Sequence, residues 1–512
     1  MTDDDTLPTI ALIPLDERPA CAALPAAVAR VAGVRAVLPP AAILPQGRTP
    51  GDADETSRWL AESARTSFAA VVSLETLGHG GLIASRTRGT TVAEVTARWN
   101  GLRGIARAGV PVHAVTLVTR TPDSADATEE PDYWDPHGPA LHRWSARLHQ
   151  GAGQEVRAPD SVPEAVRADF LRRRLRNHAL NLAALELLTD GTLESLVIGA
   201  DDTAPHALAT AELTWLGQWT GWLDGGHRTA IRPGADEACT TLVARCVTRH
   251  LGGPPPRVAL EALTAEGLAR TAPYENVSVA ETAHGQISTC GARLAAPDET
   301  ADIHLLVHTP DDAGDWAIAP PVAREEDHAA RDRAEALADR VACLLADGRT
   351  VAVADCAQPN GADPLLVHSL ASRGVLEQLT GYAAWNTAGN TLGTAVAHAV
   401  TAVTARRAGT FDEQAHQRLL LHRLLEDWAY MSRVRAALRI RCGSDPARHD
   451  HVPDGDALIA FAEGLLRDCR AELPAFGGLD ITPGSVRLPW QRTFEVDFAL
   501  SYGPADRTAE ED

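Results

Sequence analysis

The chain has 512 residues, 45% of them hydrophobic, and its formal net charge is −21. This length exceeds one ordinary hydrophobic core, so we expect two or three domains. The negative charge argues against nucleic acid and anionic membrane surfaces as partners.

All 47 basic side chains are arginine, because the sequence contains no lysine. This excludes a lysine Schiff base, a pyridoxal phosphate anchor and a P-loop lysine. Arginine can bind carboxylate or phosphate groups through paired hydrogen bonds, but it stays protonated at neutral pH. Proton transfer must therefore use other side chains.

The eight cysteines are scattered, and none forms a C-x-x-C pair or a zinc-ribbon spacing. The acidic N-terminus MTDDDT does not resemble a signal peptide. No apolar stretch reaches the roughly 18 residues that a membrane-spanning helix needs. We therefore expect a cytoplasmic protein that binds no membrane, no metal and no cofactor. Nothing in the sequence predicts the oligomeric state.

Short β-branched apolar runs alternate with alanine- and leucine-rich stretches, a pattern typical of parallel βα units. The predicted strands are, in chain order, 10–15, 34–38, 69–74, 111–118, 195–200, 229–232, 257–262, 303–308, 350–355 and 379–384. The predicted helices are 52–66, 91–107, 163–189, 204–222, 235–250, 279–293, 323–346, 364–377, 390–407, 412–441 and 455–471.

This order of elements predicts an α/β fold with repeated βα units and mainly parallel sheet. The stretch GGPPP at 252–256 divides the chain near its middle. We expect an N-terminal α/β lobe over 1–251, a second α/β lobe over 257–407, and a helical C-terminal segment with a terminal strand over 408–512. A single βα barrel is the alternative. The acidic segment 121–137 has no period and predicts a long loop, either a lid or a disordered excursion.

Polar side chains follow nearly every predicted strand. In open α/β sheets and in βα barrels, ligands bind outside the carboxyl ends of the strands. For Asp201 and Asp202, which precede Pro205, capping of the next helix is an alternative role. The strand ends supply Asp16, Arg18, Glu75, Asp201, Asp202, His206, Asp236, Asp355, Asn360, Asn386 and Asn390.

The stretch WNTAGNTLG at 385–393 places two amide side chains and two glycines where a strand turns into a helix. Glycines let the backbone approach a ligand, and a helix N-terminus offers free N–H donors. Amides can bind hydroxyls or phosphate oxygens without titrating. This stretch therefore favours a ligand-binding loop.

Several motifs together resemble the domain-of-unknown-function 4127 family of bacterial proteins: PLDERP, SLETLGHGGLIASR, the GADD of 199–202, RPGADE, ADCAQPNGADP and GYAAWNTAGNTLG. The resemblance runs from about residue 9 to about residue 498, and WNTAGNTLG is its most specific part. It implies no reaction. The site residues that it implies are Asp16, Arg18, Gly80, Gly81, Arg86, Asp201, Asp202, Asp355, Asn360, Asn386 and Asn390.

The predicted pocket mixes carboxylates, arginine and amides, and the sequence contains no G-x-S-x-G nucleophile motif. Paired carboxylates can act as acid and base when their environments separate their pKa values. We expect an enzyme acting on a sugar or sugar-like polar small molecule, first of all a glycosidase-like hydrolase. Asp201 and Asp202 would be catalytic, with Asp16 or Glu75 as the second carboxylate. Substrate would be bound by Arg18, Gly80, Gly81, Arg86, His206, Asp355, Asn360, Asn386 and Asn390.

Two alternatives stay open. A divalent-metal hydrolase would use Asp16, Asp201, Asp202 and Asp355 as oxygen ligands. A sugar-binding or regulatory protein would bind without turnover. The shared position at strand ends predicts that one cleft is lined by Asp16, Glu75, Asp202, Asp355 and Asn386.

Overall fold

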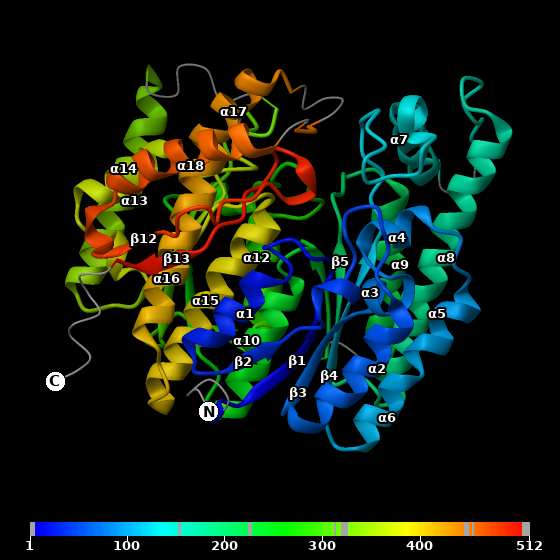
Figure 1. Ribbon diagram of the computed structural model, residues 1–512, viewed down its shortest axis with the longest axis horizontal. Coiled ribbons are helices and arrows are strands. Elements are labelled where there is room, and N and C mark those ends of the chain that lie inside the picture. Colours follow the sequence, from blue (N-terminus) through cyan, green and yellow to red (C-terminus); the bar gives the residue numbers. More distant parts are fainter. Residues whose placement is uncertain are drawn as a thin grey trace.

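The computed structural model describes residues 6–151, 155–223, 228–311, 314–318, 326–444, 450–452 and 455–503. Its long strands form two separate sheets, one in each predicted lobe, with helices packed around them (Figure 1). Every strand pair in both sheets is parallel, which confirms the predicted βα architecture. Within the described ranges neither sheet closes on itself, so the alternative of a single barrel is wrong.

The first sheet has the strand order β2-β1-β3-β4-β5-β6. Strands β3, β4 and β5 are buried along their whole length, as expected for parallel strands covered by helices on both faces. The predicted apolar runs match these strands to within two residues. Their bounds are β1 Thr9–Ile13, β2 Arg35–Val37, β3 Ala69–Ser73, β4 Val112–Val118, β5 Ser195–Ala200 and β6 Thr229–Pro233.

Helices of the first lobe include four that the sequence did not predict, α1, α3, α4 and α7. Helices α3 and α4 have six residues each, which is too short for a helical period to show. The bounds are α1 Ala23–Val31, α2 Ala53–Ser63, α3 Leu74–His79, α4 Leu82–Thr87, α5 Val92–Trp99, α6 Gly101–Arg107, α7 Trp134–Gln150, α8 Glu164–Thr189, α9 Leu208–Trp222 and α10 Ala238–Leu251.

The second sheet has the order β11-β10-β9-β7-β8. When its strands are numbered from one in chain order, the spatial order is 2-1-3-4-5, which is also the order of the first five strands of the first sheet. The sequence shows no repeat that corresponds to this similarity. Its strands are β7 Arg257–Glu261, β8 Arg293–Leu294, β9 Ile303–His308, β10 Val351–Asp355 and β11 Gly381–Ala383. Its helices are α11 Ala265–Ala269, α12 Val279–Thr289, α13 His328–Ala346, α14 Pro364–Ser372 and α15 Ala388–Ala408.

Helix α15 lies between the two lobes and is buried from Ala388 to Ala405. It contacts α10 and α1 of the first lobe as well as α12 and β11 of its own. Val28 of α1 and Val396 of α15 belong to one hydrophobic cluster. The lobes therefore share a core, which fixes the ends of their strands relative to each other.

The C-terminal segment packs on the second lobe, where Trp428 and Phe498 join the cluster that contains Val353 and Leu366. Figure 1 shows it in orange and red over that lobe. Its elements are α16 Glu413–Arg423, a π-helical stretch Leu424–Val434, α17 Arg435–Cys442, α18 Gly455–Ala471, and an antiparallel pair of β12 Leu479–Ile481 with β13 Leu500–Tyr502. In the described part of the chain, no helix combines the length and the apolar character needed to cross a membrane.

Candidate functional site

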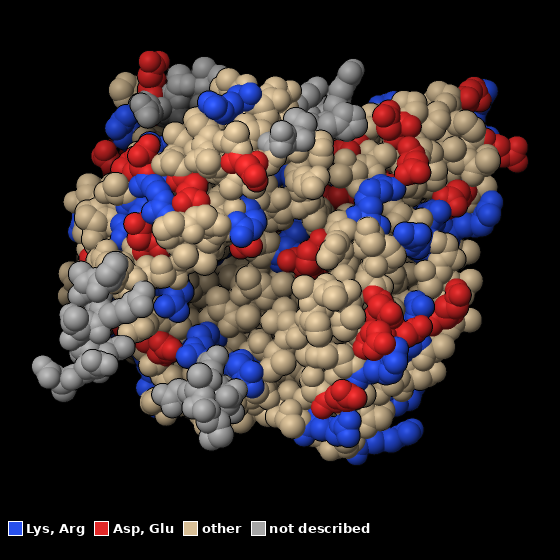
Figure 2. Space-filling model, in the orientation of Figure 1, with Lys and Arg blue, Asp and Glu red and all other residues tan. Residues whose placement is uncertain are grey.

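A partly open cavity of about 300 Å³ lies where the two lobes and the C-terminal segment meet. The first lobe contributes side chains that follow β1, β5 and β6, and the second lobe contributes side chains that follow β10 and β11. Figure 2 shows a hollow between the two halves of the molecule, with arginine and acidic side chains at its edge. The volume lies at the lower end of the range of small-molecule sites.

Seven of the thirteen predicted site residues line this cavity, and both lobes contribute to them. They are Arg18, Arg86, Asp201, Asp202, Asn360, Asn386 and Asn390. The sheet ends thus meet at one site, as predicted, although the residues come from both lobes.

Backbone strain concentrates at this cavity. Six non-glycine residues in the described ranges have a positive φ, and five of them line it: Asp202, Tyr274, Asn360, Asn386 and Trp490. A left-handed conformation costs energy for residues with a Cβ, and it persists where the surrounding structure holds it in place. Such residues cluster at functional sites, so the cavity is the candidate site on grounds independent of its lining chemistry.

A buried ion cluster forms the floor of the cavity at the end of β1. Arg18 donates to both oxygens of Asp16 and, through Nη2 at 2.6 Å, to Asp236 Oδ1. All three residues are at most 6% exposed. Asp16 therefore holds Arg18 in place from behind, while Arg18 itself reaches the cavity.

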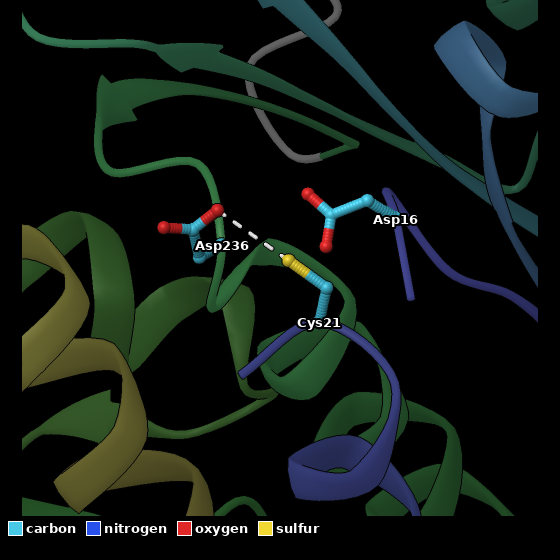
Figure 3. A group of neighbouring side chains, drawn as sticks. All are labelled: Asp16, Cys21 and Asp236. Carbon is cyan, nitrogen blue, oxygen red and sulfur yellow. Dashed lines mark hydrogen bonds between the residues drawn. The ribbon is translucent and has the colours of Figure 1, made fainter. Parts of the chain in front are cut away.

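The same floor contains the one group in the described residues with the spacing of a metal site, Asp16, Cys21 and Asp236 (Figure 3). Their potential ligand atoms lie within 4.8 Å of one another. The Arg18 guanidinium, however, already forms ion pairs with both carboxylates, and burial raises the pKa of the Cys21 thiol well above its usual range. A thiol ligand must be deprotonated, so these residues do not fit a metal ion.

The acidic segment predicted as a lid or a disordered excursion forms one wall of the cavity. Glu129 of this segment pairs with Arg86, Arg120 and Arg492. Although burial acts to raise its pKa, these arginines hold the pKa of Glu129 well below its usual range. The segment is therefore tied to the site by charge.

Asp201 and Asp202 differ in their surroundings. Asp201 is 8% exposed and pairs with Arg86, whereas the Asp202 side chain is 31% exposed, within the cavity, and pairs with Arg120 at 2.9 Å. Burial by the surrounding protein raises the pKa of Asp202 to about 6. Helix α9 begins at Leu208 without a side-chain cap, so the alternative that either residue caps this helix is wrong.

The second lobe supplies two amide loops that touch each other. Asn360 N donates to Asn386 O at 2.7 Å, Asn360 Nδ2 donates to Asp315 at 2.9 Å, and Asn386 Nδ2 reaches Asp236 at 3.4 Å. A Cβ at Gly389 would lie 2.9 Å from the Pro233 carbonyl oxygen. This glycine of WNTAGNTLG thus serves the packing of α15 on the first lobe, which corrects the prediction that it admits a ligand.

Three of the five residues predicted to line one cleft lie outside the cavity lining, so that prediction holds only in part: Asp16, which is covered by Arg18, Glu75 and Asp355. Glu75 accepts hydrogen bonds from Leu117 N at 2.8 Å and Thr116 Oγ1 at 3.0 Å, and burial raises its pKa to about 7. Asp355 accepts from Asp363 N at 2.7 Å. Both side chains bind neighbouring backbone, which makes them structural in this fold.

Three further predicted binding residues also lie away from the cavity. His206 is exposed, with its ring 5.9 Å from that of His149. Gly80 and Gly81 join α3 to α4 with positive φ, and a Cβ at Gly81 would lie 2.8 Å from Pro45. They shape the backbone and do not reach the cavity.

Sequence reasoning missed several lining residues because no strand-end pattern marks them. Tyr274 lies in the loop between α11 and α12, and Asp315 follows β9. The C-terminal segment adds Trp490, Arg492 and Phe494, which the sequence placed only in a run ending in an edge strand. Arg120 and Asp236 do follow predicted strands, and Asp236 was named among the strand-end residues, but neither was assigned a role in the site.

Comparison with known families agrees with these motifs. The model of a family described as a protein of unknown function, DUF4127, matches residues 10–499. The chain belongs to this family. No curated protein matches the DUF4127 chain in sequence, and no solved structure matches it.

Proposed function

We propose that this DUF4127 protein is an enzyme that acts on a sugar or sugar-like polar small molecule through carboxylate acid–base chemistry, as glycosidases do. The observation that carries the proposal is Asp202, a cavity carboxyl whose pKa of about 6 lies near the pH at which proton transfer is useful. The described residues donate one hydrogen bond to Asp202, from Arg120, so its other oxygen is open to a ligand.

A second carboxylate is available in the cavity lining. The strand-end pattern favours Asp16 or Glu75, but Asp16 is covered by Arg18 and Glu75 lies outside the lining. Asp315 lines the cavity from the second lobe and accepts a hydrogen bond from Tyr274 Oη. Burial raises the pKa of Tyr274, and the charges of both Asp315 and Asp202 add to the shift.

In this proposal Asp202 donates its proton to the leaving oxygen as the glycosidic C–O bond breaks. A water molecule adds to the sugar carbon, and Asp315 accepts the proton that the water loses. Asn386 and Asn390 would bind hydroxyl groups, because amides donate and accept without titrating.

The test is hydrolysis of a panel of aryl glycosides by the wild type, Asp202→Asn and the exposed control Asp298→Asn. We expect turnover by the wild type and by the control, and a loss of at least about a hundredfold in Asp202→Asn. Full activity of Asp202→Asn would contradict the assignment. Ligand binding without turnover would favour a sugar-binding protein.

A further inference from the structure

The cavity lining carries more negative than positive charge. Seven carboxylate side chains and five arginines line it. Each arginine already pairs with at least one carboxylate: Arg18 with Asp16, Arg86 with Asp201, Arg120 with Asp202, Arg439 with Asp450 and Arg492 with Glu129. Three of the acids in this network, Asp16, Glu130 and Glu495, stand behind the lining and add to the negative charge.

This pairing bears on which ligands the cavity accepts. A phosphate or carboxylate ligand binds best to an arginine fork that is free to donate two hydrogen bonds. Here such a ligand would have to displace an existing carboxylate and would add negative charge to an acidic site. The lining therefore disfavours sugar phosphates and sugar acids.

Asn360 gives a second, independent indication. It is 5% exposed and lines the cavity, and its Nδ2 donates to Asp315. Its Oδ1 has no hydrogen-bond partner among the described residues and is closed to solvent in this conformation, so the side chain must turn for a ligand to reach it. A buried acceptor without a donor is costly, so a ligand that donates hydrogen bonds at this corner would stabilise the site.

We propose that the ligand of this cavity carries a protonated amine beside its hydroxyl groups, as an amino sugar or an aminocyclitol does. The ammonium lies in the corner formed by Asp315 and Asn360, where it donates to carboxylate and amide oxygens, and Asp202 keeps its proton for the leaving group. Tyr274 flanks the same corner and offers its ring to a cation. A metal ion fits this corner poorly, since the one group of metal-like spacing in the described residues is the arginine-filled cluster of Asp16, Cys21 and Asp236.

This inference rests on the proposed function only for the hydroxyl-rich nature of the ligand. It can be tested by measuring ligand binding, which does not require catalytic turnover. Calorimetric titration of the full chain would compare glucosamine, galactosamine and mannosamine with the matching neutral sugars and with glucuronate and galacturonate. We expect at least one amino sugar to bind about tenfold or more tightly than its neutral counterpart, as a charge-assisted hydrogen bond allows. The uronates should give no detectable binding.

Two variants locate the ammonium. Asp315→Asn should remove most of the preference for the amine, while Asp202→Asn and the exposed control Asp298→Asn should keep most of it. Equal or tighter binding of a neutral sugar or a uronate, or no binding by any amino sugar, would overturn the inference. So would stoichiometric binding of Mn²⁺ that both cavity variants abolish. Amine-selective binding without hydrolysis would support this inference and contradict the proposed enzymatic function. Hydrolysis without a preference for the amine would support the proposed function and contradict this inference.

Discussion

Trp490 Nε1 donates a hydrogen bond of 2.6 Å to Glu17 Oε1, although 473 residues separate them in the chain. The Trp490 ring also lies over the guanidinium of Arg18, 4.6 Å from ring centroid to Cζ. The C-terminal segment thus returns to the end of the first strand and closes the cavity there. Both ends of the chain are needed to complete one site.

The hydrogen bond between Trp490 and Glu17 should make the effects of substitutions at these two residues on the free energy of unfolding non-additive. Glu17→Gln and Trp490→Phe each remove the charged hydrogen bond but keep most of the packing. A double-mutant cycle in urea unfolding should give a coupling free energy of about 1–3 kcal/mol. Additive effects would mean that the bond does not hold the segment in solution.

The floor of the cavity should depend strongly on Arg18. The substitution Arg18→Met leaves the carboxylates of Asp16 and Asp236 buried without their shared partner, and we expect a loss of about 3–5 kcal/mol in the free energy of unfolding. Adding Asp16→Asn and Asp236→Asn should recover part of this loss. Urea denaturation of the single and triple variants measures both effects, and an unchanged midpoint for Arg18→Met would refute the assignment.

Asp202 should make stability depend on pH in a definite direction. Its folded pKa of about 6 lies above the ordinary value, so the folded state binds the proton more tightly than the unfolded state. The stabilising proton is present at low pH and is lost as pH rises from the ordinary value through about 6. Asp202→Asn should match the wild type at pH 4 and be more stable by about 1–3 kcal/mol at pH 7. Thermal and urea unfolding at both pH values measure this difference, which a constant offset would contradict.

If Asp202 is the proton donor, kcat/KM should fall as pH rises through about 6, because the carboxyl must carry its proton. Arg120 and Arg86 lower the pKa of this carboxyl, while Asp201 raises it. The substitution Arg120→Met should therefore move the descending limb to higher pH. A profile that rises through the same range would assign Asp202 the role of base.

Activity should survive chelation. Arg18 fills the group of metal-like spacing, so removal of divalent ions should leave the rate and the melting temperature unchanged. Assays before and after dialysis against EDTA check this, with metal content measured in the native protein. Loss of activity that a divalent ion restores would revive the metal-hydrolase alternative.

The sequence alone was sufficient to predict the sheet architecture. Its apolar runs identify β5 and β9 to the residue, because parallel strands covered by helices on both faces are rich in apolar residues. The positions that follow such strands can also be identified from the sequence, and Asp202, Asn360 and Asn386 of the cavity lining are among them.

Which of these polar residues face the cavity was decided only by the tertiary structure. Glu75 and Asp202 both follow strands, but Leu117 N reaches the Glu75 carboxylate, whereas Asp202 keeps one oxygen open to the cavity. Tyr274, Asp315 and Trp490 were missed because their positions depend on how α15 joins the lobes and where the C-terminal segment returns. Hydrophobic periodicity is a local property of the chain, whereas the partner of a buried carboxylate is set by backbone that lies tens to hundreds of residues away.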